Sequence, residues 1–200
     1  MNPIEKLTEL FRKFPGVGEK QARRFTYFLL RTRPDYIEQI QKGILDIRNN
    51  IISCTRCFKF FEKKDNGNIC GTCSQTYTSQ TLMVVANDID QEILHSTDTY
   101  KGMYFILGGT IPFGQEDIPA YIRLPLLKKR ITEDRLSEII LAFPFTTPGE
   151  YTEMRILDEL QSLCREHDII LSRLGKGMSA GTELEYIDPK TFSNALENRK

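Results

Sequence analysis

The sequence predicts a chain of several modules that mixes the α+β and α/β classes. Near the N-terminus two amphipathic helical patterns meet at a Gly-x-Gly turn, which predicts a helix-hairpin-helix. Two Cys-x-x-Cys pairs follow and predict a four-cysteine zinc knuckle. Beyond them short apolar runs alternate with helical patterns, which predicts a mostly parallel sheet flanked by helices. With a short C-terminal segment, we expect four parts, at residues 1–52, 53–76, 77–173 and 174–200.

Three helices are expected before the cysteines. Asn2-Pro3 is a start signal, with Asn as the cap and Pro at the first helical position. The first helix then carries an apolar stripe up to Phe14, and further helices are expected over 19–31 and 35–51. The side chains expected to face inward are Ala22, Phe25, Leu29 and Leu30 on the second helix and the isoleucines at 37, 40, 44, 47 and 51 on the third.

The turn between the first two helices has the chemistry of a phosphate site. Gly16 and Gly18 allow a tight turn and a close approach of another molecule to the backbone. The start of the second helix offers unpaired N–H groups and the positive end of the helix dipole. Lys20, Arg23 and Arg24 follow on this helix. We therefore expect contact with the sugar-phosphate backbone of DNA without reading of bases; the alternative is an ordinary turn between helices with a solvated basic face.

The distribution of charge favours a nucleic-acid contact in the first third of the chain. The formal net charge is zero, but the first 64 residues hold twice as many Lys and Arg as Asp and Glu. A hydrophobic content of 40% is enough for a packed core. No signal peptide and no apolar run of membrane-spanning length is visible, so a cytoplasmic protein that uses no membrane is expected.

Four cysteines predict a metal site. The first pair is Cys54 and Cys57, and the second is Cys70 and Cys73. Two residues lie between the members of each pair, and twelve lie between the pairs. Two such turns complete a tetrahedral shell for one Zn²⁺, and a full shell indicates a structural metal. The alternative is two disulfides or two redox pairs, and a cytosolic chain gains little from disulfides. The nearby Phe58, Phe60 and Phe61 are expected to pack this module.

Four apolar runs predict the strands of the sheet. They lie at about 82–85, 104–107, 139–143 and 169–171, and such continuous runs are typical of parallel strands covered on both faces. Helical patterns lie over 88–95, 117–130, 149–167 and 189–197.

In this order, the parts resemble the bacterial RecR family of recombination mediators over essentially the whole chain. The matching segments are the hairpin at 14–20, the four cysteines, Gly109 with 116–118, residues 181–186 and the tail at 195–199. The resemblance implies a Toprim-type sheet domain, a ring-like homotetramer with the C-terminal segment in its assembly, and a role in DNA repair. It implies RecO and RecF as partners in loading recombinase on gapped DNA. It places DNA contact on Lys20 and Arg24, with Arg23 beside them, and metal ligation on the cysteines.

Two segments depart from the family's pattern. The first Toprim strand normally ends in an acidic residue linked with partner docking, whereas Ala86-Asn87 stand there in this chain. Asp90 still matches a second acidic position and is the candidate partner-binding residue. The segment at 109–113 is shortened and lacks a His. The resemblance therefore implies a divergent member with an altered partner or duty.

The same comparison argues against catalysis. An active Toprim site needs a Glu at the first strand end and an Asp-x-Asp after a later strand, which hold Mg²⁺ against a phosphoryl group. Ala86 and the Phe-Pro-Phe at 143–145 stand there, and none can bind a hard cation through its side chain. We expect a non-enzymatic DNA-binding mediator. The alternatives are a zinc-stapled module that only bridges proteins, and an enzyme on nucleic acid with a site rebuilt from Asp88, Asp90, Glu150 and Glu153.

Overall fold

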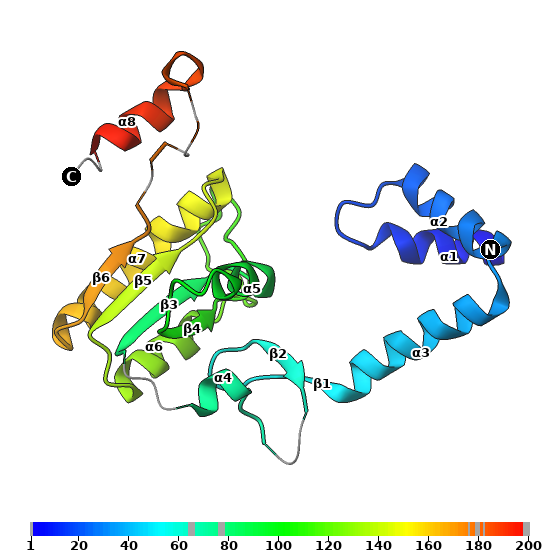
Figure 1. Ribbon diagram of the computed structural model, residues 1–200, viewed down its shortest axis with the longest axis horizontal. Helices are drawn as coiled ribbons and strands as arrows, with labels where there is room; N and C mark the ends of the chain where they lie inside the picture. Colours follow the sequence, from blue (N-terminus) through cyan, green and yellow to red (C-terminus); the bar gives the residue numbers. More distant parts are fainter. Residues whose placement is uncertain are drawn as a thin grey trace. The chain divides into compact units, whose positions relative to one another are not determined.

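A computed structural model describes residues 2–63, 67–75, 79–175, 177–178, 181 and 183–197 (Figure 1). The chain divides into two compact units, Met1–Ile51 and Ile52–Lys200. The fold class confirms the prediction: a helical hairpin, a four-cysteine cluster and a parallel sheet flanked by helices follow one another. The four-part division stays a prediction, and parts of the matching segments at 181–186 and 195–199 lie outside the described residues. Within the described part, no helix is both long and apolar enough to cross a membrane.

The first unit consists of α1 (Pro3–Arg12), α2 (Glu19–Arg31) and α3 (Pro34–Asn50). A capping box starts α1: the Ile4 N–H donates to Asn2 Oδ1 at 3.0 Å, and the Asn2 N–H donates to Glu5 Oε2 at 3.1 Å. α1 and α2 pack together through the buried hydroxyls of Thr8 and Thr26, 3.0 Å apart, and through edge-to-face rings of Phe11 and Phe25. The hairpin is therefore held by its own small core.

Two expectations about the inward faces of these helices are wrong. On α2, Ala22 is buried, but Leu30 is 61% exposed. On α3 no described residue is buried, and Ile44 and Ile47 of the expected stripe are both more than half exposed. An apolar stripe is buried only if another element covers it, and within this unit α1 and α2 cover each other while α3 runs away from them (Figure 1).

The cysteine module contains β1 (Ile51–Ser53), β2 (Phe60–Glu62) and α4 (Gly71–Ser74), with β1 and β2 paired. Of the three phenylalanines expected to pack it, Phe61 does so against the cysteines. Phe58 instead packs on the large sheet, where its ring lies 5.2 Å from that of Phe105, and Phe60 is exposed. The module is thus attached to the sheet by one of its own aromatic residues.

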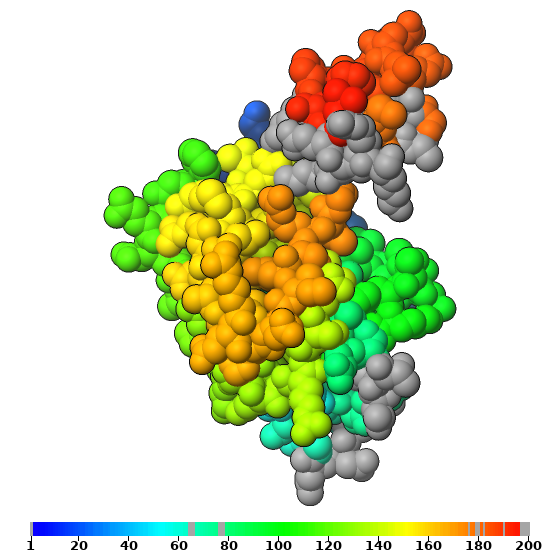
Figure 2. Space-filling model, turned by 90° about the vertical axis from the view of Figure 1, so that its left-hand side faces the viewer, coloured from blue at the N-terminus to red at the C-terminus, as the bar shows by residue number. Residues whose placement is uncertain are grey.

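The large sheet is parallel, with the order β4-β3-β5-β6. Its strands are β3 (Thr81–Val85), β4 (Met103–Ile106), β5 (Glu138–Ala142) and β6 (Ile170–Arg173). On one face α6 (Leu124–Glu133) and α7 (Thr147–Glu166) complete the main core, and on the other face α5 (Asp88–Ser96) covers a smaller cluster. Figure 2 shows α7 beside the β6 edge, coloured yellow to orange. Covering both faces explains the continuous apolar strands.

The longer helices and the four strands of the large sheet match the expected ones to within a few residues, except around residue 117. The helix expected over 117–130 begins only at Leu124, because residues 108–123 form a loop with fixed backbone contacts. Arg155 of α7 donates from Nη1 to the Gln115 carbonyl at 3.0 Å and from Nη2 to the Glu116 carbonyl at 2.7 Å. The side chain of Arg155, distant in sequence, thus overrides the local helical pattern.

Near the C-terminus a short 3₁₀ turn, η1 (Leu184–Tyr186), precedes α8 (Pro189–Glu197).

Candidate nucleic-acid interface and metal centre

The turn between α1 and α2 leaves the start of α2 open. Gly16 has a φ of 75°, in the left-handed region, and lets the chain reverse direction after α1. Gly18 is the cap residue of α2, with φ −80° and ψ 171°, and it provides no side-chain hydrogen bond to the first turn. The first N–H groups of a helix have no carbonyl partner within it, so these donors remain available to a ligand. Apart from its two neighbours in the chain, no part of the described residues lies within 4 Å of a Cβ placed on Gly18, so a ligand can approach this backbone closely.

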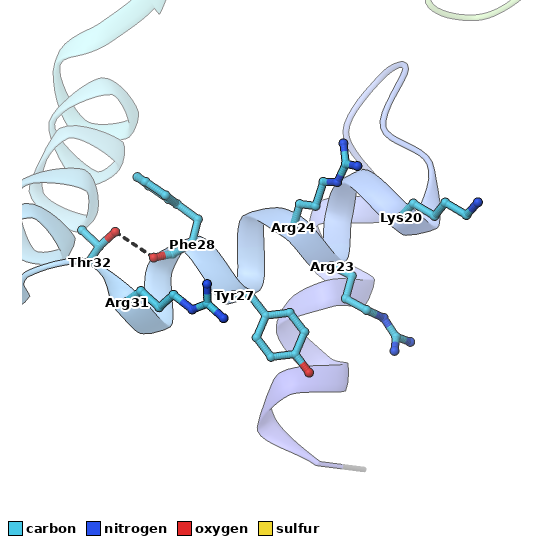
Figure 3. A pocket seen from close by; sticks show the side chains of 7 residues that line it. All are labelled: Lys20, Arg23, Arg24, Tyr27, Phe28, Arg31 and Thr32. Atoms are coloured by element: carbon cyan, nitrogen blue, oxygen red, sulfur yellow. Dashed lines mark hydrogen bonds between the residues drawn. The ribbon is translucent and has the colours of Figure 1, made fainter.

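One face of α2 carries cations and aromatic rings around a hollow of about 700 Å³. Thr32 closes one end of it, and the side chains that form the α2 basic–aromatic face are Lys20, Arg23, Arg24, Tyr27, Phe28 and Arg31. Figure 3 shows Arg24 and Phe28 directed to one side of the helix and Arg23 and Tyr27 to the other. All six side chains are exposed or half-exposed.

Most of these cations have no acidic partner. Arg23 forms an exposed ion pair with Glu19 at 3.6 Å. Among the ion pairs between described residues, none includes Lys20, Arg24 or Arg31. Unpaired cations around an open helix start form a positive surface suited to phosphate oxygens.

Of the five residues predicted to contact DNA, Lys20, Arg23 and Arg24 line one hollow, whereas Gly16 and Gly18 lie in the turn before it, and DNA contact by all five stays a prediction. The sequence reasoning missed Tyr27, Phe28 and Arg31, which line the same hollow as Lys20 and Arg24. The spacing indicates part of this arrangement, because positions 20, 24, 28 and 31 recur at intervals of three or four residues on one side of the helix, while Tyr27 lies on the other side beside Arg23 (Figure 3). Sequence alone could not show whether the two aromatic rings of the α2 basic–aromatic face are buried or exposed.

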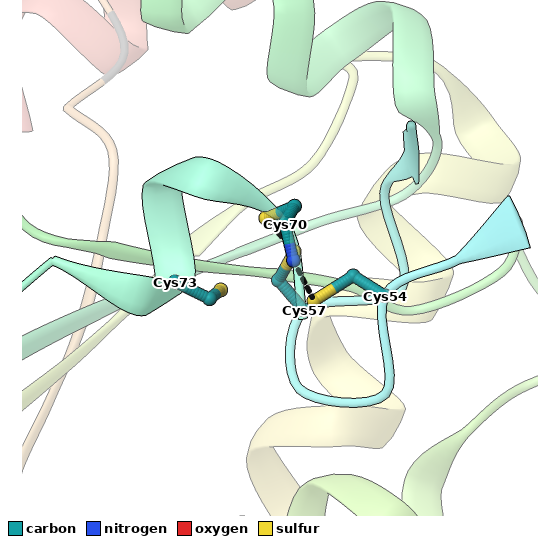
Figure 4. A group of neighbouring side chains, drawn as sticks. All are labelled: Cys54, Cys57, Cys70 and Cys73. Atoms are coloured by element: carbon teal, nitrogen blue, oxygen red, sulfur yellow. Dashed lines mark hydrogen bonds between the residues drawn. The ribbon is translucent and has the colours of Figure 1, made fainter. Parts of the chain in front are cut away.

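The four cysteines form one buried cluster (Figure 4). All four Sγ atoms lie within 4.8 Å of one another, and Cys57 Sγ and Cys70 Sγ are 3.6 Å apart. A tetrahedral zinc site with Zn–S bonds of about 2.3 Å has sulfur atoms about 3.8 Å apart, so the donor set fits a single ion of this kind. All are free thiols, which excludes disulfides between them in this structure.

The surroundings of Cys54 favour its sulfur in the charged form. Backbone N–H groups of Arg56 and Cys70 donate to Cys54 Sγ at 3.5 and 3.4 Å. Hydrogen bonding from Cys57, and then from Cys73, lowers the pKa of Cys54 well below that of a free thiol. Hydrogen bonding with Cys54 raises the pKa of Cys57 to about 12 and also raises that of Cys73. Thiolate is the ligand form that metals require, so a metal ion that binds here would release the protons of these thiols.

The carboxyl ends of the strands do not gather acidic side chains. Ala86 and Phe143 are buried there, and Glu153 is engaged with Arg173 at 3.6 Å. Asp88 accepts a hydrogen bond from the Phe60 N–H at 3.2 Å. Among the described residues, the four cysteines are the one group of three or more His, Cys, Asp and Glu side chains close enough to share a metal.

Asp90 lies in the first turn of α5 next to this edge. Its N–H donates to the cap residue Asn87, while its Oδ2 is buried and has no hydrogen-bond partner. Burial raises the pKa of this carboxyl group. The neighbouring Ile89 and Ile93 of α5 are exposed. Asp90 thus lies beside an apolar surface, and its role in partner binding stays a prediction.

Comparison with known proteins matches both units to families. Residues 4–47 match the helix-hairpin-helix model of RecR, and residues 80–174 match the Toprim domain model. Among curated relatives named "Recombination protein RecR", the one from Phytoplasma mali is 35% identical, over 98% of this chain and 93% of its own length. Those from Rickettsia felis and Chloroflexus aurantiacus are each 31% identical, over 100% and 99% of this chain and 96% and 94% of their own lengths.

Proposed function

Since this chain belongs to the RecR family of recombination proteins, with relatives such as one 35% identical along nearly the whole chain, we propose that it is a non-enzymatic DNA-binding recombination mediator. In this role it binds DNA through the sugar-phosphate backbone and acts in repair in the cytoplasm. The observation that supports this best is the open start of α2 beside unpaired Lys20 and Arg24. Backbone contacts of this kind position a protein on DNA without selecting a sequence.

Zn²⁺ is the metal that we propose for the cysteine cluster, one ion per chain. Four thiolates fill a tetrahedral shell and leave no position for water, so the ion stabilises the fold and takes no part in chemistry. The ligands are Cys54, Cys57, Cys70 and Cys73. When bound, the ion joins the two Cys-x-x-Cys turns into one rigid module.

The sheet domain is proposed to hold no phosphoryl-transfer site. Ala86 and Phe143 occupy the strand ends where an active Toprim domain needs carboxylates, and both side chains are buried in the core. The domain is then a scaffold for assembly and partner docking, with RecO and RecF as the proposed partners and Asp90 as the proposed contact. A ring of four chains would present several α2 faces to one DNA and so increase avidity.

Binding to a gapped duplex tests this function. We compare the full chain with Lys20→Ala/Arg24→Ala and with a control of equal charge, Lys6→Ala/Lys42→Ala, whose exposed lysines lie on α1 and α3 outside the hollow. The first variant is expected to lose most binding at low salt while keeping its mass by light scattering, and the control to bind like the unmodified protein. Unchanged affinity of the first variant would contradict the assignment.

A cleavage assay tests the absence of catalysis. Labelled DNA incubated with the purified protein and Mg²⁺ or Mn²⁺ should stay intact. Cleavage that co-purifies with the protein and disappears in Glu153→Gln would indicate a rebuilt acidic site instead.

The second candidate is a zinc-stapled module that only bridges proteins, and the exposed apolar side chains of α3 favour it. Ile44, Leu45 and Ile47 are each about 60% exposed and lie outside the α2 face. A protein that shows no DNA binding at low salt, yet forms a defined complex with purified RecO or RecF, would support this candidate over the first.

A further inference from the structure

We propose that the α2 basic–aromatic face is a site for single-stranded DNA, with unpaired bases stacked on Phe28 and Tyr27 and phosphates held by the neighbouring cations. The inference rests on the proposed function and names the form of DNA that this face takes. The inference is based on two exposed rings that line the same hollow as the cations.

Cations and rings alternate along this face. Arg24 and Phe28 are four residues apart, as are Arg23 and Tyr27, and Lys20 and Arg31 lie at the two ends. Phe28 and Tyr27 are 56% and 44% exposed, so both rings are accessible to a ligand. A positive groove with interleaved aromatic rings is the common solution for binding single strands without sequence preference.

The ring of Phe28 is held in place before any ligand binds. Tyr36 at the start of α3 contacts it edge to face, with ring centres 6.2 Å apart and planes at 87°. The hydroxyl of Thr32 donates to the Phe28 carbonyl at 2.7 Å, and this hydrogen bond stabilises the last turn of α2. Tyr36 can cover at most one face of the Phe28 ring in such a pair, so the other face stays clear of Tyr36. A ring that is already fixed loses little entropy when a base stacks on it.

Carboxylates on the opposite side of Tyr27 limit the strand to one side of α2. A second hollow of about 190 Å³ lies there and contains Glu5, Glu9 and Glu19. Tyr27 and Arg23 line both hollows and form the ridge between them. Carboxylates repel a phosphate backbone, so the strand is confined to the side of Lys20, Arg24 and Arg31.

Base stacking distinguishes this proposal from backbone binding alone. Bases of a duplex are stacked inside the helix and cannot lie on a protein ring, whereas unpaired bases in a gap can. A single strand should therefore gain affinity from Phe28 and Tyr27, and a duplex should gain none. An oligonucleotide of the same length without bases keeps the phosphates and removes the stacking.

The test uses the full chain and three labelled DNAs: a single strand, its abasic counterpart and a duplex. The double variant Tyr27→Leu/Phe28→Leu keeps apolar bulk but removes both rings. The control is Phe14→Leu, because Phe14 is 55% exposed in the same unit, lies outside the hollow and has a ring contact with Phe11. We expect the unmodified protein and the control to bind the single strand about tenfold more tightly than the abasic strand.

The double variant should bind the single strand and the abasic strand equally and should bind the duplex like the unmodified protein. Equal affinity of the unmodified protein for the two strands would overturn the inference, as would an equal loss on all three DNAs. A changed mass of the double variant by light scattering would also overturn it, because the rings would then lie between copies of the chain. Loss of all binding in Lys20→Ala/Arg24→Ala, with no effect of the ring variant, would retain the proposed function and reject only the stacking.

Discussion

Gly16 and Gly18 flank one residue in the sequence, but they have different physical roles. Gly16 has positive φ, which costs a residue with a side chain about 1–2 kcal/mol. Gly18 has an extended backbone that any residue adopts, and it caps α2 without a side chain. The first glycine is therefore required by the turn, and the second keeps the helix start open.

The substitution of each glycine by Ser separates these roles. Gly16→Ser should lower the free energy of unfolding by about 1–2 kcal/mol, because it strains the left-handed turn. Gly18→Ser should leave stability unchanged or raise it by a few tenths of a kcal/mol, since Ser is a good cap residue. Its hydroxyl would occupy the N–H groups that we assign to phosphate, so DNA affinity should fall. Urea denaturation and fluorescence anisotropy measure the two effects, and a Gly18→Ser variant with full DNA affinity would contradict the phosphate assignment.

Asp90 gives a prediction about pH. Its pKa is raised by burial above the ordinary value of 3.8, so its neutral form is favoured in the folded protein. Such a group contributes stability below its unfolded pKa and loses that contribution as pH rises through the folded pKa. Asp90→Asn should therefore stabilise the protein at pH 7 by less than about 1 kcal/mol, since solvent screens this partly exposed group. The difference in melting temperature should shrink toward pH 3, and a destabilised variant at pH 7 would contradict the burial argument.

At the scale of elements, one buried guanidinium connects the cysteine module to the sheet. Arg130 of α6 is 6% exposed, and its Nη1 donates to the carbonyls of Arg56 and Tyr104, each at 2.8 Å. Asp134 accepts from Arg130 Nε and from Arg56 Nη2, both at 3.0 Å. Arg56 lies between Cys54 and Cys57, so this network fixes one Cys-x-x-Cys turn against β4.

Removal of this guanidinium should therefore be costly. Arg130→Met is expected to lower the free energy of unfolding by about 3 kcal/mol, because buried carbonyls and a carboxylate lose a charged donor. The control is Lys129→Met, whose ion pair with Glu133 is exposed and 3.7 Å long, and its cost should stay below about 0.5 kcal/mol. Equal effects in denaturant titrations would show that the network does not hold the module.

Most elements could be predicted because their signals are local. The cap at Asn2, the glycines and the proline at 34 determine where the first three helices begin and end, and α2 has the predicted bounds. The start of α6 could not be predicted, because Arg155 fixes the backbone at 115 and 116 from α7. The exposure of the isoleucines on α3 could not be predicted either, because burial depends on which elements cover an apolar stripe. The pattern of isoleucines carries no information about that.

For the molecule as a whole, the grouping of the four cysteines and of the cations after the turn could be predicted, because it follows from spacing alone. The exposure of Tyr27 and Phe28 could not be predicted, because aromatic residues at helical spacing occur more often in a core. We propose that the first unit binds DNA, and that the cysteine cluster and the sheet of the second unit have structural roles.

Thiol chemistry tests the proposed structural role of a metal in the second unit. The chain has five cysteines, of which four form the cluster, while Cys164 is buried in the main core with its pKa raised by burial. In the metal-bound native protein a thiol reagent should react slowly with all five. After chelation four should react quickly and the melting temperature should fall, whereas Cys164 should react only on unfolding. Rapid reaction of the four cysteines before chelation, in protein shown by elemental analysis to contain zinc, would contradict their role as its ligands.

The dependence of DNA affinity on salt tests most directly the claim that Lys20 and Arg24 hold phosphates. We measure binding of the full chain to a labelled duplex by fluorescence anisotropy over a series of salt concentrations. The logarithm of the binding constant should fall linearly with the logarithm of salt, and Lys20→Ala/Arg24→Ala should make that slope shallower by about two for each chain in contact with the DNA. The Lys6→Ala/Lys42→Ala control should keep the original slope. An unchanged slope and affinity in the first variant would contradict the account.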